Sequence, residues 1–282
     1  RMSYFEGRTA VLGTMHGKEK VLKPILEKHL GIRLILPEQF DSDQFGTFTR
    51  DIQRAGNQLE AARLKARAAM RLTGVDLGIA SEGSFGVDPD IPFIRSNLEL
   101  LLLIDEKNEF EIKGHHRSSD TNIAGQYVAN FEEALAFAQR VGFPLHAVVV
   151  RQSEESKKPI YKGIRTEEDL KHSVNELLSR LFTRRVYIET DMRAHMNPTR
   201  MDKIAKAAEN LVANIACKCP RCDAPGFVVT KTKQGLVCSS CQLPTHSVMS
   251  YAHTCQKCAL EMEFPREDKL FEDPQMCSRC NP

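Results

Sequence analysis

The sequence predicts an α/β fold in which a mixed-sheet α/β domain over residues 1–216 is followed by a small cysteine-rich domain over residues 217–282. Three observations support this prediction. Short apolar runs alternate with helical apolar patterns throughout the first part. All nine cysteines lie after residue 216, which marks a boundary in composition. The length of 282 residues leaves room for one large domain and one small one.

The composition is that of a globular protein and argues against several classes of function. Hydrophobic residues make up 41% of the chain, and 39 lysines and arginines nearly balance 37 aspartates and glutamates. The net charge of +2 gives no general argument for a nucleic-acid partner, so any phosphate binding must be local. The longest apolar run, Leu98 to Ile104, is far shorter than the roughly 20 residues of a membrane span. The opening residues lack a secretory signal, and we therefore expect a cytoplasmic protein without a membrane partner.

The first half of the α/β domain predicts two strand–helix units followed by three strands. Gly31 ends the first helix and Gly74 ends the second, because glycine readily adopts the backbone conformation that closes a helix. The last two strands pair across a turn over residues 106–109. The predicted strands cover residues 9–13, 32–36, 75–80, 98–105 and 110–113, and the predicted helices cover residues 21–30 and 55–72.

The second half predicts three more helices and two more strands. Thr166 is the N-cap of one helix, and Asn197 with Pro198 forms the capping pair that opens another. His115 and His116 fall in a polar stretch that we interpret as a solvated loop. The predicted helices cover residues 131–142, 167–180 and 198–216, and the predicted strands cover residues 146–150 and 186–190.

The cysteines have the spacing of zinc ligands. Eight of them form four Cys-x-x-Cys pairs: Cys219, Cys222, Cys238, Cys241, Cys255, Cys258, Cys277 and Cys280. Grouping neighbouring pairs leaves 15 residues between the pairs of the first site and 18 between those of the second, both typical of four-cysteine zinc sites. Adjacent ribbons can exchange pairs, so another grouping stays open. Cys217 is the spare cysteine, and disulfides are disfavoured without an export signal.

This pattern predicts two structural Zn²⁺ ions as cofactors. Four thiolates leave no open coordination position, so each ion would stabilise a segment too small to bury a sufficient core. Zinc ribbons often bind nucleic acid or protein, which makes nucleic acid a candidate partner of this domain. Acidic residues in the second ribbon offset much of the basic character of the first.

The run that begins at Glu60, EAARLKARAAMRLTG, resembles a helix of the inosine triphosphate pyrophosphatase-like family, whose pattern is E-N-A-x-x-K-A-x-A-A-x-x-x-T-G. The stretch 78-GIASEGSF-85 is similar to the acidic, glycine-rich turn that follows this helix in the family. The stretch 9-TAVLGTMHGK-18 is similar to the family's opening strand and phosphate loop. The chain also resembles an uncharacterised bacterial family in which cysteine pairs follow an α/β part.

The resemblance implies a divalent-metal-dependent hydrolase of nucleoside triphosphates. It makes Glu60 a ligand of Mg²⁺ or Mn²⁺, Glu82 a metal ligand or the activator of water, and Lys18 a phosphate contact. Backbone N–H groups around Gly83 and Ser84 would also meet the substrate. Independently of the resemblance, a glutamate near a helix start and another at a strand end would lie at the same rim of an α/β sheet, where ligands usually bind.

Polar residues before the last helix suggest a second wall for this pocket. The stretch 189-ETDMRAHMNPTR-200 places Asp191, Arg193 and Arg200 after a strand, and we treat these three as substrate-binding candidates. A polar loop with a helix cap is the alternative interpretation.

The leading hypothesis is a hydrolase or binder of nucleoside triphosphates that carries structural zinc ribbons. The alternative is a non-enzymatic zinc-ribbon protein that binds nucleic acid or a protein partner. Under that alternative, Glu60 is a first-turn residue stabilised by the helix dipole, Glu82 a loop residue and Lys18 a surface lysine. The chain contains no G-x-x-x-x-G-K-[ST], G-x-S-x-G or H-E-x-x-H motif, which argues against P-loop enzymes, α/β-hydrolases and zincins.

Overall fold

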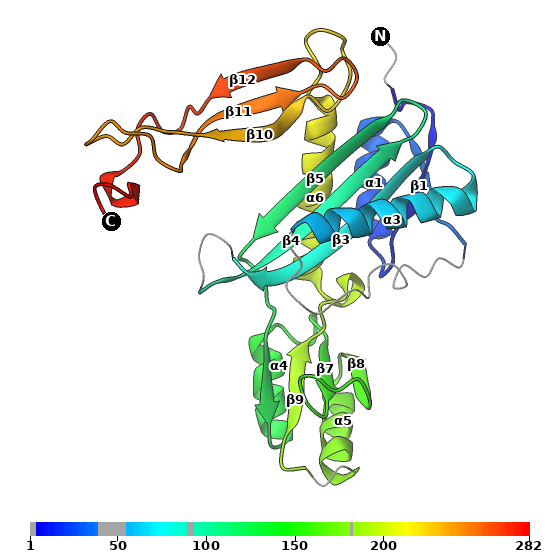
Figure 1. Cartoon of the computed structure of the whole chain (residues 1–282). Helices are drawn as coiled ribbons and strands as arrows, with labels where there is room; N and C mark the ends of the chain where they lie inside the picture. The colour runs from blue at the N-terminus through cyan, green and yellow to red at the C-terminus, as the bar shows by residue number, and fades with distance from the viewer. Residues whose placement is uncertain (1–3, 39–54, 89–92, 181–182) are drawn as a thin grey trace.

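The computed structural model describes residues 4–38, 55–88, 93–180 and 183–282 (Figure 1). These residues form a large lobe, a small lobe inserted into it, and a ribbon domain that carries the cysteines. The small lobe and the ribbon domain extend from opposite ends of the large lobe (Figure 1). None of the described helices is long and apolar enough to span a membrane.

The large lobe is a mixed five-stranded sheet between helices, so the predicted mixed α/β class is confirmed. Its strands are β1 (Thr9–Gly13), β2 (Arg33–Ile35), β3 (Leu77–Val87), β4 (Arg95–Asp105) and β5 (Phe110–Ser118), and its helices are α1 (Glu19–Leu30), α3 (Ala55–Thr73) and α6 (Pro198–Ala216). The sheet order is β2-β1-β3-β4-β5. β1 runs parallel to β2 and β3, whereas β4 runs antiparallel to β3 and β5.

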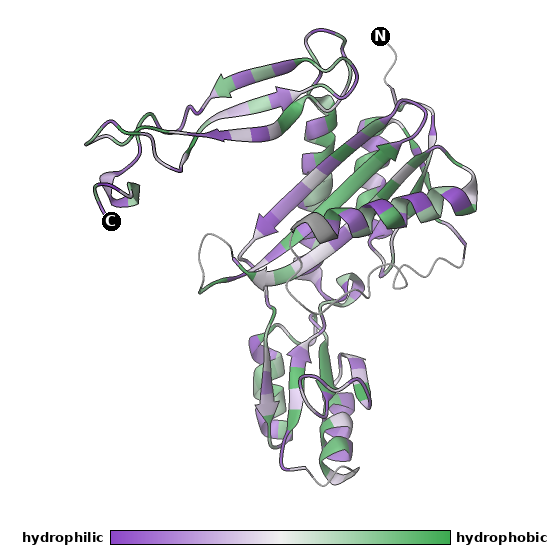
Figure 2. Ribbon diagram, in the orientation of Figure 1, coloured by the Kyte–Doolittle hydropathy of each residue, from purple (hydrophilic) through white to green (hydrophobic). Residues whose placement is uncertain are grey.

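Helices cover both faces of this sheet. Leu101 and Leu103 of β4 belong to the apolar cluster that contains α1 and α6, and Leu100 and Leu102 belong to the cluster that contains α3. A strand buried on both faces needs apolar residues at successive positions, which explains the uninterrupted apolar run in β4. Figure 2 shows hydrophobic residues concentrated along the central strands of the sheet.

β3 projects beyond the end of β1. It pairs with β1 only as far as Ala80, while its pairing with β4 continues to Val87. The sequence-based prediction ended this strand at residue 80 and put Glu82 in a turn. That prediction was wrong because glycine also occurs within strands where another group approaches closely. β5 likewise continues to Ser118, so the histidines predicted in a loop lie on a strand.

The small lobe lies between β5 and α6 in the sequence. It contains strands β6 (Gly125–Val128), β7 (Val148–Arg151), β8 (Ile160–Ile164) and β9 (Val186–Thr190), and helices α4 (Phe131–Arg140) and α5 (Glu167–Arg180). The antiparallel sheet has the order β6-β9-β7-β8, and both helices pack on one of its faces. The sequence analysis missed β6 and β8 because only one residue of each strand is buried, which leaves a weak apolar signal.

The ribbon domain is an antiparallel sheet of β10 (Val228–Gln234), β11 (Val248–Thr254) and β12 (Glu261–Pro265). β10 and β12 are exposed at nearly every residue. One end of the domain is anchored to the large lobe, because Phe227 and Cys255 belong to the large-lobe core. Gln256 strengthens this attachment by exchanging two hydrogen bonds with the backbone of Glu111 in β5.

Candidate functional site

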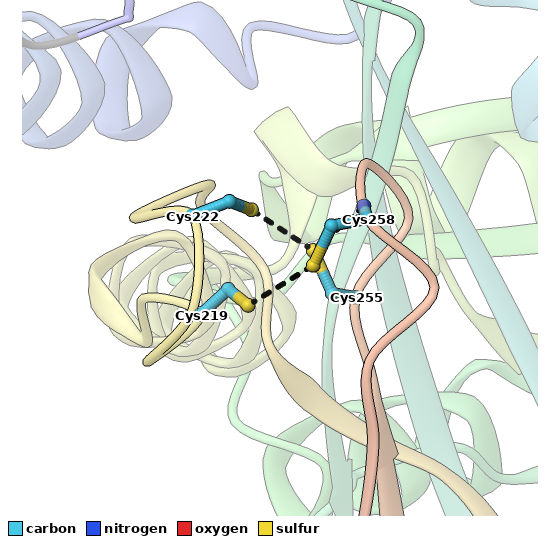
Figure 3. Close-up of side chains that lie close together, drawn as sticks. All are labelled: Cys219, Cys222, Cys255 and Cys258. Carbon is cyan, nitrogen blue, oxygen red and sulfur yellow. Dashed lines mark hydrogen bonds between the residues drawn. The ribbon is translucent and has the colours of Figure 1, made fainter.

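The eight paired cysteines gather into two groups. We name them the proximal site (Cys219, Cys222, Cys255 and Cys258) and the distal site (Cys238, Cys241, Cys277 and Cys280), and within each group the sulfur atoms lie within 4.8 Å of one another. In the proximal site, the Sγ atoms of Cys219 and Cys258 are 3.6 Å apart, as are those of Cys222 and Cys255 (Figure 3). Sulfurs arranged tetrahedrally around one zinc ion would be about 3.8 Å apart. Each group can therefore hold one zinc ion.

The pairing of the Cys-x-x-Cys motifs differs from the neighbouring pairing that their spacing suggested. The first motif joins the third, and the second joins the fourth. Since β10, β11 and β12 run antiparallel, each strand carries the chain to the other end of the sheet, and successive motifs arrive at alternate ends. The exchange that the sequence left open is thus the observed arrangement. The spare Cys217 caps α6 and is exposed, outside both groups.

Both sites have the donor set of structural zinc sites. Four thiolates complete a tetrahedral shell, so neither site keeps a position for a substrate. The proximal site also belongs to the large lobe, because Cys219 and Cys255 are buried in its core. Backbone hydrogen bonds around the distal site stay within the ribbon domain, for example from Cys238 N to Leu243 O and from Ser239 N to Glu272 O.

A pocket of about 690 Å³ lies between the two lobes. It exists because β3 is longer than its neighbour β1: past Ala80, β3 keeps β4 on one side but has no β1 residue on the other, and its side chains line open space. The loop after β1, helix α3, the start of β4 and the start of α6 supply the other large-lobe residues, and β7 and β9, with residues of β6 and β8, supply the facing wall. Within the described part of the chain, no ribbon-domain residue lines this pocket. Its volume falls in the range of about 300–1,000 Å³ that is typical of small-molecule sites.

Lys18 is a deeply buried cation of the pocket, with 6% of its surface exposed. Its Nζ donates a hydrogen bond of 3.2 Å to Ser81 Oγ, and no described carboxylate forms an ion pair with it. Burial and the nearby charge of Arg200 lower the pKa of Lys18 to about 8. On the same side of the pocket, Lys65 of α3 forms an ion pair with Glu82 of β3.

Arg200 enters the pocket from the first turn of α6. Its Nε donates to Glu99 Oε1 over 2.8 Å, and its Nη1 donates to the carbonyl oxygen of Met192 over 2.6 Å. Its guanidinium lies over the ring of Phe85, 5.1 Å from the centroid. Glu99 is fully buried, and among the described residues its Oε2 has no hydrogen-bond partner. Gly83 makes room for this pair, because a Cβ atom there would lie 2.7 Å from Glu99 Oε1.

The small-lobe sheet turns its helix-free face to the pocket. Arg151 of β7 and Glu189 of β9 alternate with residues that pack on the helices, so both point into the pocket. Arg151 and Glu189 form an ion pair. Beside them, Tyr187 forms a hydrogen bond with Glu154.

Asp191 fixes the segment between β9 and α6. Its carboxylate accepts a hydrogen bond of 3.0 Å from the backbone N–H of Gly163 and one of 2.6 Å from Nη2 of Arg193. Burial raises the pKa of Asp191, but the hydrogen bonds from Arg193 outweigh this effect and hold the pKa below its usual value. The rings of His16 and His195 stack beside this segment, with centroids 5.2 Å apart.

Positive charge prevails around the pocket. Among the described lining residues, seven are cations and four are carboxylates: Lys18, Lys65, Arg95, Arg151, Lys162, Arg193 and Arg200, against Glu82, Glu154, Glu189 and Asp191. A concave site with this balance attracts an anionic ligand even though the chain as a whole is nearly neutral.

All site residues predicted in the α/β domain line this pocket except Glu60. The lining residues are Lys18, Glu82, Gly83, Ser84, Asp191, Arg193 and Arg200. Glu60 lies outside, has a side chain that is 56% exposed, and pairs with Arg63. Lys65 lies five positions after Glu60, which places the two residues about 140° apart around α3, so Glu60 points away when Lys65 faces the pocket. The expected convergence of Glu60 and Glu82 is therefore not found.

The divalent ion that the family resemblance implies has no matching ligand set here. Mg²⁺ and Mn²⁺ bind several oxygen ligands at once, with carboxylates prominent among them. Glu60 is outside the pocket, and Glu82 pairs with Lys65. Among the described residues, the groups of histidine, cysteine, aspartate and glutamate that lie close enough to hold a metal are the two cysteine sites.

Several residues in or beside the pocket were not selected as site candidates from the sequence. Arg151 and Glu189 alternate with the apolar residues of their strands. This alternation indicates a polar face opposite the apolar one and could have identified a second functional face. Glu99 interrupts an apolar run, and a buried charge of this kind requires a partner. Lys65 matched the family pattern but received no role.

A family model described as a domain of unknown function, DUF6671, matches residues 65–282. The match includes Lys65, Glu82, Arg200 and both cysteine sites, and it leaves out β1 and Lys18. No curated protein matches the chain.

Proposed function

Because the chain belongs to the DUF6671 family, whose description assigns no activity, we propose a function from the pocket between the lobes. The pocket binds nucleoside triphosphates, and the chain hydrolyses them at a phosphoanhydride bond. One observation carries this proposal: Lys18, Lys65 and Arg200 gather near Glu82 in a pocket of suitable volume for a nucleotide.

The residues suggest how such a reaction would proceed. Lysine and arginine are the usual protein partners of phosphate oxygens, so the three cations hold the polyphosphate. The bound phosphates draw Lys65 away from Glu82, whose carboxylate then takes a proton from a water molecule. That water attacks the α-phosphorus, the bond from this phosphorus to the bridging oxygen breaks, and pyrophosphate leaves.

Pyrophosphate release from a panel of canonical and damaged nucleoside triphosphates tests this function. We expect the wild-type chain to release pyrophosphate from at least one of them. The Glu82→Gln variant should bind the same triphosphate without hydrolysing it, because an amide cannot accept the proton. Equal zinc content in both proteins is the control for folding. Absence of both binding and hydrolysis across the panel would refute the proposal.

Binding without hydrolysis by the wild-type chain would leave a nucleotide-binding protein. Calorimetry with the same panel distinguishes this outcome from the loss of all binding. Glu82→Gln would then change affinity but no rate.

The ribbon domain supports a second candidate function, the binding of nucleic acid or a protein partner. The observation in its favour is that β10 and β12 are exposed and lie far from the small lobe (Figure 1). Filter binding of RNA and DNA at increasing salt concentration tests the nucleic-acid form of this idea, because phosphate contacts weaken steeply with salt. Absence of binding at low salt would exclude it.

A further inference from the structure

Every described carboxylate that lines the pocket is already held by a side chain of the protein. A divalent ion would have to displace these partners before it gained a ligand. The pairs are Glu82 with Lys65, Glu189 with Arg151, Asp191 with Arg193, and Glu154 with Tyr187.

The cations of the large-lobe wall outnumber its carboxylates: Lys65 pairs with Glu82 and Arg200 pairs with Glu99, which leaves the charge of Lys18 in excess. Lys18 is buried beside a hydroxyl group, and among the residues that the structure describes no carboxylate lies within ion-pair distance of it, although Glu82 and Glu99 are near. Lys65 forms an ion pair with Glu82, and the side chain of Glu82 is only 14% exposed. This wall therefore carries buried positive charge that a bound anion would neutralise.

Arg200 is held in one orientation by three contacts. Glu99 accepts a hydrogen bond from its Nε, the Met192 carbonyl accepts one from its Nη1, and the ring of Phe85 lies against its plane. These contacts use Nε, Nη1 and one face of the guanidinium, and Arg200 still lines the pocket. An arginine fixed in this way loses little side-chain entropy when it binds an anion.

We propose that Lys18, Lys65 and Arg200 form an oxyanion site that binds a diphosphate or triphosphate group directly, without a bridging divalent ion, and that Glu99 is the positioning residue of Arg200. The inference rests on the proposed function, because it concerns the same pocket. It departs from the metal dependence that the family resemblance implies.

Magnesium affects the two modes of binding in opposite directions. In a direct site, Mg²⁺ in solution complexes the free polyphosphate and lowers its negative charge, so affinity for the protein falls. In a bridged site, Mg²⁺ links carboxylates of the protein to the phosphate oxygens, so affinity rises with its concentration.

Calorimetry with inorganic pyrophosphate separates these modes. The full, zinc-loaded chain is titrated in buffer that has been stripped of divalent ions on a resin, because a soluble chelator would also attack the thiolate sites. The same titration is repeated with excess Mg²⁺. We expect binding in the stripped buffer and weaker binding with Mg²⁺.

The outcomes distinguish this inference from the proposed function. Binding that appears or strengthens with Mg²⁺ would overturn the direct site and leave a nucleotide pocket intact. No binding of pyrophosphate in either buffer would overturn the direct site, and if the triphosphate panel also failed to bind, the proposed function would fall with it.

Variants test the individual cations. Lys18→Gln should weaken pyrophosphate binding by about 10- to 100-fold, the usual worth of a hydrogen bond to a charged group. Lys18→Arg, which keeps the charge, should recover much of this loss. Arg63→Gln is the matched control, because Arg63 pairs with Glu60 and Glu111 outside the pocket. A loss with Arg63→Gln equal to that with Lys18→Gln would contradict a local site.

The role of Glu99 is tested through Arg200. Glu99→Gln alone and Arg200→Gln alone should each weaken binding, whereas the double variant should bind no worse than Arg200→Gln, because a positioning residue acts through the residue that it positions. Thermal unfolding of each variant separates this effect from a loss of stability. Additive losses of affinity would show that Glu99 does not position Arg200.

Discussion

At the residue scale, Gly83 controls the approach of Arg200 to Glu99. A Cβ atom at this position would collide with the Arg200 guanidinium and lie 2.7 and 2.8 Å from the two Glu99 carboxylate oxygens. Real Cβ atoms do not tolerate such contacts, so any side chain at position 83 must push the ion pair away from β3. The glycine is therefore needed for the pocket rather than for a turn.

Gly83→Ala should lower the affinity for pyrophosphate more than it lowers stability. Arg200 would leave its position over Phe85, and we expect a loss of at least about 10-fold, comparable to the loss of a charged hydrogen bond. Gly74→Ala is the matched control, because a Cβ atom at residue 74 meets nothing within 4 Å but its φ of +69° is strained. That variant should cost about 1–2 kcal/mol of stability and leave affinity unchanged. Calorimetry and thermal unfolding together distinguish the two patterns.

Lys18 should give anion binding a characteristic pH dependence. Burial lowers its pKa to about 8, so at higher pH the free protein must take up a proton before Lys18 can bind an anion. Affinity for pyrophosphate should therefore fall as pH rises through about 8, by up to about tenfold per pH unit. Lys18→Arg keeps its charge across this range and corrects for titration of the ligand. An unchanged ratio of wild-type to Lys18→Arg affinity from pH 7 to pH 10 would contradict the assignment.

Sequence reasoning paired one carboxylate that lines the pocket, Glu82, with one that lies outside it, Glu60. Glu82, Asp191 and Arg200 were identified because polar residues at strand ends and helix starts tend to share a rim. Glu60 was taken from a family pattern that fixes residue type but not direction. The helical period gives the direction only once Lys65 is known to face Glu82, and that contact depends on the packing of α3 against β3.

At the scale of elements, the two cysteine sites stabilise different parts of the molecule: the proximal site is part of the large-lobe core, and the distal site belongs to the ribbon domain alone. The proximal site lies at the junction of β11, α6 and β5, with Cys219 and Cys255 inside the large-lobe core. The distal site lies at the other end of the three-stranded sheet. Zinc binding contributes directly to folding where the ligands come together only in the folded state.

Cys219→Ser and Cys238→Ser form a matched pair, since each replaces the buried first cysteine of its motif. Both variants should lose one of the two zinc ions. Cys219→Ser should also increase amide hydrogen exchange in β5 and α6, whereas Cys238→Ser should affect only the outer end of the ribbon domain. Zinc analysis and hydrogen exchange measure these effects. Equal exchange in the large lobe of both variants would contradict the coupling of the proximal site to its core.

The interleaved cysteine pairing was accessible from the sequence in principle but not from spacing alone. The intervals of 15 and 18 residues favour the neighbouring grouping, whereas the observed grouping leaves 32 and 35 residues between its pairs. The fold of each interval decides between the groupings. An interval that forms one strand puts its two flanking motifs at opposite ends of the sheet, whereas a hairpin would bring them together. β10 and β12 are exposed on nearly every residue, so no apolar alternation marked them as strands.

At the scale of the whole molecule, the pocket draws on two separate cores. The large lobe and the small lobe each have their own apolar cluster, and the segments around residues 119–124 and 191–197 join them. Asn122 and Asn197 link these two segments by a side-chain hydrogen bond of 2.8 Å. A ligand in the pocket touches residues of both lobes and so couples their stabilities.

Pyrophosphate should protect both lobes from hydrogen exchange at the same time. Protection is expected in β3, in β7 and in β9, with no change at the distal site. At 100 times its dissociation constant, a ligand adds about 2.7 kcal/mol to the free energy of unfolding of whatever must open to release it. The Lys18→Gln variant at the same ligand concentration is the control. Protection confined to the large lobe would show that the small-lobe wall does not take part in binding.

The place of α6 in the chain has a consequence for biosynthesis. This helix covers one face of the large-lobe sheet, with Ile204 and Leu211 packed in the same cluster as Leu101 and Leu103 of β4. It is translated only after the entire small lobe, which separates it from β5. On the ribosome, the part of that apolar face that α1 does not cover therefore stays exposed while the small lobe emerges and folds, and the nascent chain depends on residues 198–216 to cover a sheet made long before them.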